Sequence, residues 1–456
     1  MPSTVVDSAI LGNLFSSEAM RAVFGDENRT QKYLDVEAAL SRVQGRLGVI
    51  PAAAADEIER HCKLAQIDMD LLRTQTERAG SPVVGLVQQL TALCANDAGQ
   101  YCHWGATTQD ITDTATVLQL REALALVEAD LVAISSSLAR LARDHRDTPM
   151  VGRSHLQQAA PITFGFKIAT VLSAIERHRS RLAEIRPRLL VGEFAGAVGT
   201  LASIATFGDR ALATQAALMH ELDLGQPDIA WHAQRDCIAE VGSFIGWVVG
   251  TLDKFATDIK LMMQTEVGEV YEPFTQGRGS SSTMPQKRNP VSCVYIHACS
   301  TAARQHVATL LEAMVTDHER ATGPWHAEWI ALPEVFLFAS GALAHARFLA
   351  EGLQVDAARM RENLDLTHGL VVSEAVMMGL APHLGRQRAH DLVYDLCRKA
   401  LEEKRPLLEL LNETREITSK VDGPTLARLC DPANYLGLAG TMVDRVLAAR
   451  TKRKIG

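Results

Sequence analysis

Residues 113–148 read DTATVLQLREALALVEADLVAISSSLARLARDHRDT, and this stretch contains neither glycine nor proline. Its apolar side chains recur in steps of three and four, at positions 117, 120, 124, 127, 131, 134, 138 and 141. Such steps place these side chains along one face of an α-helix. The stretch therefore predicts one long amphipathic helix, roughly 45 Å long if ~30 residues are helical.

The same stepping returns between Ile238 and Met262. Three further segments predict long helices, at about residues 161–186, 290–315 and 327–353, the last with Pro333 as a kink or as its true start. Five helices this long are unusual for one globular core. Only 5% of the residues are aromatic, which disfavours sandwiches and barrels. We therefore predict an all-α fold around a bundle of long helices.

The 456 residues are enough for two or three domains. Short turns indicate an N-terminal helical domain over residues 1–110, followed by a central long-helix bundle over 111–355. Residues 356–456 predict a small helical domain, punctuated by Gly423-Pro424 and Asp431-Pro432. A solitary bundle of this length exposes apolar flanks, which favours association between subunits. Contacts within one chain are the alternative.

Composition argues against several classes of function. The formal net charge is −8, whereas binding to nucleic acid or to an anionic membrane favours an overall positive charge, so neither partner is expected. The sequence has no CxxC pair, zinc-like histidine spacing, phosphate loop or Rossmann fingerprint, so we expect reduced thiols, no metal and no organic cofactor. It has no uninterrupted apolar stretch of about 20 residues, so no membrane span is expected. The N-terminus does not read as a signal peptide, which favours a cytoplasmic location.

Residues 279–290 read GSSSTMPQKRNP and lead into a predicted helix. Asn289 suits the N-cap and Pro290 the first helical position. A helix N-terminus binds anions through free backbone N–H groups, and Lys287 and Arg288 add full charges. The segment therefore predicts a site that stabilises an anion derived from a carboxylate. Its glycine- and serine-rich start, taken alone, is more typical of a connector.

Residues 103–114 read HWGATTQDITDT, directly before the first long helix. Thr107, Thr108 and Gln109 offer neutral donors for carboxylate oxygens. Asp110 or Asp113 suits a helix cap, which is the more common role of an aspartate at a helix start.

Residues 152–161 read GRSHLQQAAP, a loop bounded by glycine and proline. The pKa of a histidine lies near 6.5 when unperturbed, so His155 suits proton transfer or an electrostatic clamp. A structural or merely exposed histidine is the alternative.

Three weaker segments add charged side chains. Arg235 lies in WHAQRD (231–236), where substrate binding competes with helix capping and a surface salt bridge. Arg320 suits bidentate pairing with a substrate carboxylate. Glu266 and Glu269 precede the 279–290 segment and are expected to orient Lys287 or neighbouring helices.

The string Ser-Ser-x-Met-Pro-x-Lys-x-Asn-Pro, from Ser281 to Pro290, resembles the signature of the fumarase/aspartase superfamily. Residues 107–110 resemble its first conserved region. Residues 154–161 resemble its second, Thr-His-x-Gln-x-Ala-x-Pro, with Ser154 in place of the usual threonine. The three regions follow the superfamily's order. This resemblance implies a helical three-domain subunit and a homotetramer whose active sites are each built from three subunits.

The resemblance also implies roles for individual residues. Ser281 matches the catalytic serine, and His155 and Lys287 complete the expected catalytic set. Asp110 is expected to be mainly structural. Substrate contacts are expected from Thr107, Thr108, Gln157, Arg278, Asn289, Arg235 and Arg320.

Within the superfamily, the chain resembles the 3-carboxy-cis,cis-muconate cycloisomerase branch, in strings such as QTEVGE (264–269), WHAEW (325–329) and DPANYLG (431–437). This implies cofactor-free lactone formation from a small anionic tricarboxylate in the β-ketoadipate pathway of aromatic degradation. At residues 80–84, GSPVV replaces the histidine-containing segment of the purine-pathway lyases, which argues against adenylosuccinate lyase.

Three questions stay open at this point. His155 belongs to the lyase pattern, whereas the muconate branch varies there, so the proton-transfer partner of Ser281 is undecided. A C–N lyase of the same superfamily, like argininosuccinate or adenylosuccinate lyase, would use the same residues. A non-catalytic bundle protein is the third reading, and the joint presence of Ser281, His155 and Lys287 argues against it.

Overall fold

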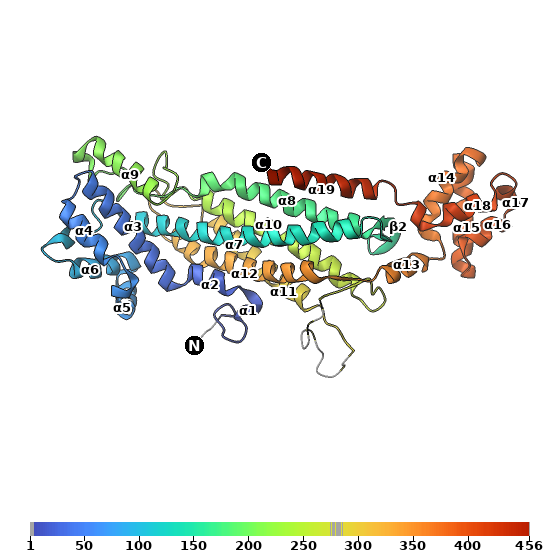
Figure 1. The fold of residues 1–456 in the computed structure, drawn as a ribbon, viewed down its shortest axis with the longest axis horizontal. Helices are drawn as coiled ribbons and strands as arrows, with labels where there is room; N and C mark the ends of the chain where they lie inside the picture. Colours follow the sequence, from blue (N-terminus) through green and yellow to red (C-terminus); the bar gives the residue numbers. More distant parts are fainter. Residues whose placement is uncertain (1–3, 274, 276–278, 280–283, 285, 456) are drawn as a thin grey trace. The chain divides into compact units, whose positions relative to one another are not determined.

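The computed structural model describes residues 4–273, 275, 279, 284 and 286–455, with the backbone alone for 452–455 (Figure 1). Five long helices dominate it: α7 (Thr108–Asp144), α8 (Phe164–Leu189), α10 (Asp236–Met262), α11 (Val291–Glu312) and α12 (Pro324–Gly352). Each coincides with a stretch for which the sequence predicts a long helix. The predicted all-α class is therefore confirmed.

Shorter helices make up most of the rest. Before α7 they are α1 (Gly12–Phe15), α2 (Glu18–Phe24), α3 (Asp26–Arg46), α4 (Ala52–His61), α5 (Met69–Ala79) and α6 (Pro82–Leu93). Between α8 and α10 in sequence lies α9 (Asp209–Glu221). After α12 they are α13 (Ala357–Asp365), α14 (Ser373–Leu384), α15 (Arg386–Glu403), α16 (Leu407–Glu413), α17 (Arg415–Thr418), α18 (Gly423–Cys430) and α19 (Ala439–Ile455). Short 3-10 helices cover Leu64–Gln66, Ala98–Tyr101, Ala205–Phe207, Leu370–Val372 and Pro432–Asn434.

The described strands form two small antiparallel sheets. β1 (Pro149–Ser154) pairs with β2 (Gln157–Thr163), and β3 (Val270–Tyr271) pairs with β4 (Gln354–Val355). The β1–β2 hairpin corrects the expectation of a helix from about Pro161, because β2 runs to Thr163 and α8 begins only at Phe164. Pro161 lies opposite Val151 in a two-stranded sheet, where the missing N–H of proline is tolerated.

The chain forms two compact units. Unit 1 contains residues 1–131, 178–252 and 295–344, and unit 2 contains residues 132–177, 253–294 and 345–456. These units cut through the long helices and do not follow the boundaries at 110 and 355. The three-domain division therefore stays a prediction.

The apolar stripe of α7 is buried along its whole length, as its spacing predicts. In unit 1, Val117, Leu120, Leu124, Val127 and Leu131 are all 0% exposed. In unit 2 the stripe continues with buried side chains at positions 134, 138 and 141. Full burial of a large aliphatic side chain contributes roughly 1.5–3 kcal/mol, so this stripe is a main source of stability in both units.

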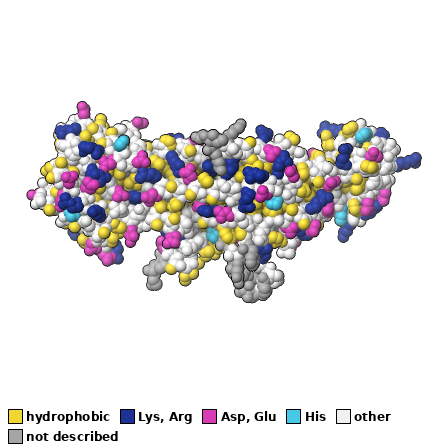
Figure 2. All heavy atoms as spheres, in the orientation of Figure 1, with side chains coloured by type: hydrophobic (Ala, Val, Ile, Leu, Met, Phe, Trp, Pro, Cys, Tyr) yellow, Lys and Arg dark blue, Asp and Glu magenta, His cyan; other side chains and the backbone are white. Residues whose placement is uncertain are grey.

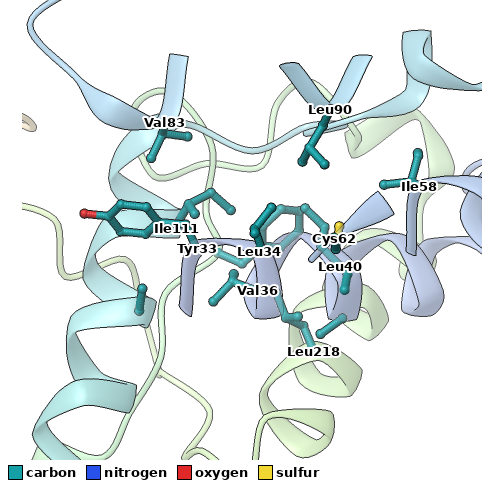
Figure 3. Close-up of a cluster of buried hydrophobic side chains, with 14 of the residues drawn as sticks. Tyr33, Leu34, Val36, Leu40, Ile58, Cys62, Val83, Leu90, Ile111 and Leu218 are labelled. Carbon is teal, nitrogen blue, oxygen red and sulfur yellow. The ribbon is translucent and has the colours of Figure 1, made fainter. Parts of the chain in front are cut away.

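Each unit also has a core built mainly from the shorter helices. In unit 1, α3, α4, α6, the start of α7 and α9 share a cluster that includes Leu34, Ile58, Leu90, Ile111 and Leu218 (Figure 3). This core holds the start of α7, where the motif with Thr107 and Thr108 lies. In unit 2, α14, α15, α16 and α18 enclose their own cluster, with side chains at positions 376, 380, 407 and 426 that are 0% exposed.

One unbroken helix of the described chain, α12, is long and apolar enough to cross a membrane. Within its most apolar window, 67% is buried inside the protein, as in the core helix of a globular protein. Figure 2 shows acidic and basic side chains intermixed over the visible face. A cytoplasmic location and the absence of nucleic-acid partners stay predictions.

Candidate active site

Asp110 is the centre of a buried hydrogen-bond network in unit 1. Its carboxylate accepts the backbone N–H of Thr107 at 2.9 Å and those of Ala195 and Gly196, both at 3.0 Å. His232 Nε2 lies 2.8 Å from Asp110 Oδ1. With 1% exposure and these partners, Asp110 ties the start of α7 to the loop after α8. This geometry agrees with the structural role implied by the resemblance.

Thr107 and Thr108 lie directly in front of this network and are half-buried. α7 begins at Thr108. Among the described residues, the two hydroxyls have no hydrogen-bond partner, so both can donate to a ligand. Arg320 approaches the same loop, where its Nη2 donates to the carbonyl oxygen of Ala197 at 2.8 Å. Substrate binding by these three residues stays a prediction.

Glu193 joins the network and was not foreseen from the sequence. Its carboxyl accepts the backbone N–H of Trp231 at 3.0 Å and is fully buried. Burial, together with the nearby charges of Asp113 and Asp110, raises the pKa of Glu193 to about 9. Glu193 is therefore protonated near neutral pH, which avoids three carboxylate charges in one buried site.

Asp110, Glu193 and His232 offer ligand atoms within 4.8 Å of one another, a spacing compatible with a metal ion. However, the Asp110 oxygens already accept three backbone N–H groups, and Glu193 accepts that of Trp231. A protonated Glu193 is also a poor ligand. The donor set therefore does not fit a resident metal, and we assign none.

Arg235 has a different environment from the one expected. Its Nη1 and Nη2 donate to Asp113 at 2.7 and 3.1 Å, and its Nε and Nη2 donate to Glu328 at 2.8 and 2.5 Å. Trp325 Nε1 also donates to Asp113, at 3.0 Å. The predicted surface salt bridge is instead a buried one, with Arg235 2% exposed. Both edges of the guanidinium are engaged, which leaves its predicted substrate contact without geometric support.

A pocket of about 470 Å³ lies beside this ion-pair cluster within unit 1. Its lining includes the charged Arg235, Asp113 and Glu328 and the aromatic Trp325 and Trp329. Thr107 and Thr108 are not among its lining residues. The pocket therefore lies beside Asp113, near the end of the 103–114 motif, and beside Arg235, but not beside Thr107 and Thr108.

In unit 2, His155 lies at the tip of the β1–β2 hairpin. Ser154 pairs with Gln157, so His155 and Leu156 form a two-residue turn. Their φ angles are +51° and +62°, values that asparagine and glycine normally supply in such turns. Both residues are exposed, Leu156 by 77%, and Gln157 is exposed beside them. Strained, exposed residues of this kind concentrate at functional sites.

Glu269 holds the hairpin near its turn, through Arg153 of β1. Its carboxylate binds Arg153 at 2.7 and 2.9 Å and accepts Nδ2 of Asn363 at 2.8 Å. Glu269 therefore orients the hairpin and α13, not Lys287. Glu266 is exposed, and its carbonyl oxygen accepts Nη2 of Arg359 at 3.2 Å.

The signature segment is described only in part. Ser281 and Arg278 lie outside the described residues. Lys287 is exposed. Asn289 donates through both its backbone N–H and its Nδ2 to the carbonyl oxygen of Gly279, each at 3.2 Å. α11 begins at Val291, one residue beyond the predicted start.

The N-terminus of α11 does not offer the free donors expected of it. The buried carboxylate of Glu272 accepts the backbone N–H of Ser292 at 3.0 Å and that of Cys293 at 2.9 Å. The prediction that this helix end binds a substrate anion through those N–H groups is therefore wrong. An anion near Lys287 would depend on side-chain donors instead.

Comparison with known proteins shows the family to which this chain belongs. Residues 15–304 match the family model described as lyase, and residues 369–446 match the one described as adenylosuccinate lyase C-terminus. The chain belongs to the lyase family. This confirms the resemblance to the fumarase/aspartase superfamily, and the chain is thus of the lyase and isomerase kind of enzyme.

Individual relatives align with this chain over nearly the full length of both proteins. It is 54% identical to trans-aconitate decarboxylase 1 of Mycosarcoma maydis, over 98% of this chain and 90% of the relative. It is 49% identical to 3-carboxy-cis,cis-muconate cycloisomerase of Pseudomonas aeruginosa, over 98% and 97%. The crystal structure of the 3-carboxy-cis,cis-muconate lactonizing enzyme from Pseudomonas putida superposes with a TM-score of 0.91 at 45% identity, covering 96% and 98%. The relationship to the muconate lactonizing enzymes is confirmed.

Proposed function

We propose that this enzyme is a 3-carboxy-cis,cis-muconate cycloisomerase, which forms a carboxymuconolactone without metal or organic cofactor. The observation that carries the proposal is the complete signature string from Ser281 to Pro290 in a chain 49% identical to a named cycloisomerase. The β-ketoadipate pathway and a small tricarboxylate substrate are part of this proposal.

The reaction is an addition to a conjugated double bond. A substrate carboxylate oxygen attacks one carbon of the double bond, and the electron pair moves toward the carbon α to a second carboxylate. The resulting aci-carboxylate carries additional negative charge until a proton is delivered to that α carbon. Fixed positive groups in a site that excludes water stabilise such an intermediate strongly.

Every predicted site residue except Arg235 has a place in this scheme. Lys287 and Asn289 stabilise the aci-carboxylate, and Arg278 meets a further carboxylate. Ser281 is our choice for the proton-transfer group, activated by the surrounding positive field. His155, exposed at its hairpin tip, acts as its acid/base partner or as an electrostatic clamp. Thr107, Thr108 and Gln157 bind carboxylate oxygens, and Arg320 pairs with a substrate carboxylate.

Decarboxylation of trans-aconitate is a second candidate, favoured by the 54% identity to a named trans-aconitate decarboxylase. The two reactions share one step, the delivery of a proton to a carbon α to a carboxylate. When trans-aconitate loses CO₂ from its CH₂ carbon, the electron pair of the broken C–C bond forms a new double bond, and the former double bond takes up a proton. That proton also goes to a carbon α to a carboxylate. One site of the same charge could therefore serve either substrate.

A C–N lyase, which would release an amine or ammonia, remains the third candidate because it uses the same residues. Its products differ from those of both other reactions, so product analysis separates it from them.

We also propose a homotetramer in which each active site takes residues from three subunits. Two features support association. His155 and Leu156 are presented outward in a strained turn. Apolar side chains on the long helices are also exposed, among them Trp247 by 56%, Val294 by 53% and Ile330 by 67%. Subunit contacts would cover such side chains.

The deciding experiment measures the activity of the purified enzyme on 3-carboxy-cis,cis-muconate and on trans-aconitate. With 3-carboxy-cis,cis-muconate we expect the diene absorbance to disappear without release of CO₂. Higher kcat/KM for trans-aconitate, with one CO₂ released per turnover, would assign the enzyme to decarboxylation. Preference for argininosuccinate or adenylosuccinate would assign it to the C–N lyases.

A further inference from the structure

Glu272 forms a two-point cap on the N-terminus of α11. Oε2 accepts the N–H of Ser292 at 3.0 Å, and Oε1 accepts the N–H of Cys293 at 2.9 Å. Glu272 is 6% exposed, so these bonds are shielded from water. A carboxylate is one of the anions that the positive end of a helix binds. The protein thus fills this anion site with one of its own side chains.

The cap belongs to a set of bonds around the signature segment. The carbonyl oxygen of Glu272 accepts Nη2 of Arg288 at 3.2 Å, and Gln354 Oε1 accepts the same nitrogen at 2.9 Å. The Arg288 guanidinium also lies 4.8 Å from the ring centroid of Tyr271. The chain is therefore held to residue 272 on both sides of Asn289, at Arg288 and at Ser292. Lys287 is the immediate neighbour of the first of these anchors.

We propose that Glu272 is a positioning residue for Lys287 and Asn289, an inference that rests on the proposed function of those two side chains. By joining residue 272 to the first turn of α11, it sets where the segment from Lys287 to Pro290 enters the helix. Its charge also neutralises the helix end. The substrate anion is therefore directed to side-chain donors, because a second anion at the α11 N-terminus would be repelled.

A helix cap without this role is the alternative to exclude. A simple cap lowers stability when removed but leaves the kinetics of the folded enzyme unchanged. A positioning residue lowers kcat/KM in the folded enzyme, and a small anion that refills the site restores the kinetics. Hydrogen exchange of the backbone amides reports on the positioning itself and needs no substrate.

The main variant is Glu272→Ala, which leaves a space the size of a small carboxylate in front of two N–H groups. Glu266→Ala is the matched control, because Glu266 is an exposed glutamate six residues before Glu272, on the other side of β3. For Glu272→Ala we expect faster exchange over residues 286–294 and a fall in kcat/KM of roughly tenfold, the size of a lost cap with charge. Formate should reverse both effects. Formamide at equal concentration and chloride at equal ionic strength should not.

If Glu272→Ala does not fold, Glu272→Gln serves in its place, since it keeps the shape and one acceptor oxygen. In this variant, hydrogen exchange over residues 286–294 should rise by less than in Glu272→Ala. Formate should not reverse the rise, because the glutamine amide fills the space.

Unchanged exchange over residues 286–294 would overturn the proposal, and so would faster exchange with unchanged kcat/KM. An enzyme that is inactive on both tricarboxylates would refute the proposed function instead. In that case formate-reversible exchange would still support the positioning role of Glu272, and its absence would overturn that role.

Discussion

Arg153, two residues before His155 in the β1–β2 hairpin, forms a two-point ion pair with Glu269. The Nη1–Oε2 distance is 2.9 Å and the Nη2–Oε1 distance is 2.7 Å. Glu269 is fully buried, and Asn363 of α13 donates to the same carboxylate. β-Pairing sets the register of the hairpin, but this ion pair sets how the hairpin is held against α13. The position of His155 thus depends on a residue more than a hundred positions away.

Glu269→Ala should destabilise the protein by about 2–4 kcal/mol, because it leaves the half-buried Arg153 cation without its partner. Urea unfolding measures the change. The double variant Arg153→Leu/Glu269→Leu serves as the control and should recover part of the loss, since no unpaired charge remains. A single variant within about 0.5 kcal/mol of the wild type would contradict the assigned role.

Glu193→Gln should change how stability depends on pH. The folded pKa of about 9 exceeds the ordinary value of 4.5, so the folded state keeps a proton that the unfolded state loses. This contribution to stability is complete below pH 4.5 and is lost as the pH rises toward 9. Glutamine cannot titrate, so its stability relative to the wild type should rise across this window by at most about 1.4 kcal/mol per pH unit.

The measurement for Glu193→Gln is urea unfolding at pH 6 and pH 8.5. The stability difference between variant and wild type should favour the variant more at pH 8.5. The exposed Glu402→Gln change is the control and should show no such trend. An equal difference at both pH values would refute a protonated Glu193.

Leu156→Gly should stabilise the hairpin by about 0.5–1 kcal/mol, because glycine adopts the left-handed conformation at φ +62° without strain. Thermal unfolding of the purified protein measures this. Leu212→Gly, at a 64% exposed position within α9, is the matched control and should cost about 1 kcal/mol. A destabilised Leu156→Gly variant would show that Leu156 makes contacts that outweigh the strain.

Ser281→Ala should fold and assemble normally but lose activity by on the order of 10²-fold or more, as expected on removal of a principal proton-transfer group. Steady-state kinetics with the preferred tricarboxylate measure the effect, and Ser280→Ala is the neighbouring control. Turnover close to the wild-type rate would remove Ser281 from the mechanism.

Complementation between two inactive variants tests whether active sites are shared by subunits. His155→Ala and Ser281→Ala, mixed after mild dissociation and reassembled, should regain partial activity, because some mixed sites contain both intact residues. Each variant taken alone through the same procedure is the control. A monodisperse active monomer in light scattering would refute the shared site and the tetramer.

The long helices could be predicted because the apolar spacing that marks each one lies within a single segment of the sequence. The three- and four-residue steps in α7 describe one buried face, and that face is buried wherever it packs. The signature from Ser281 to Pro290 was equally local, and it was sufficient for the family. The hairpin around His155 was missed because its turn lacks the glycine or asparagine that normally marks one.

Pairings across long separations could not be predicted in this way. The sequence by itself determined the all-α class, the five long helices and the family, since each depends on spacing within one segment. Only the tertiary structure decided that Glu269 holds Arg153, that Glu193 lies buried beside Asp110, and that Glu272 occupies the end of α11. A carboxylate pairs with whichever donor the fold brings within about 3 Å, and its neighbours in sequence do not specify that donor.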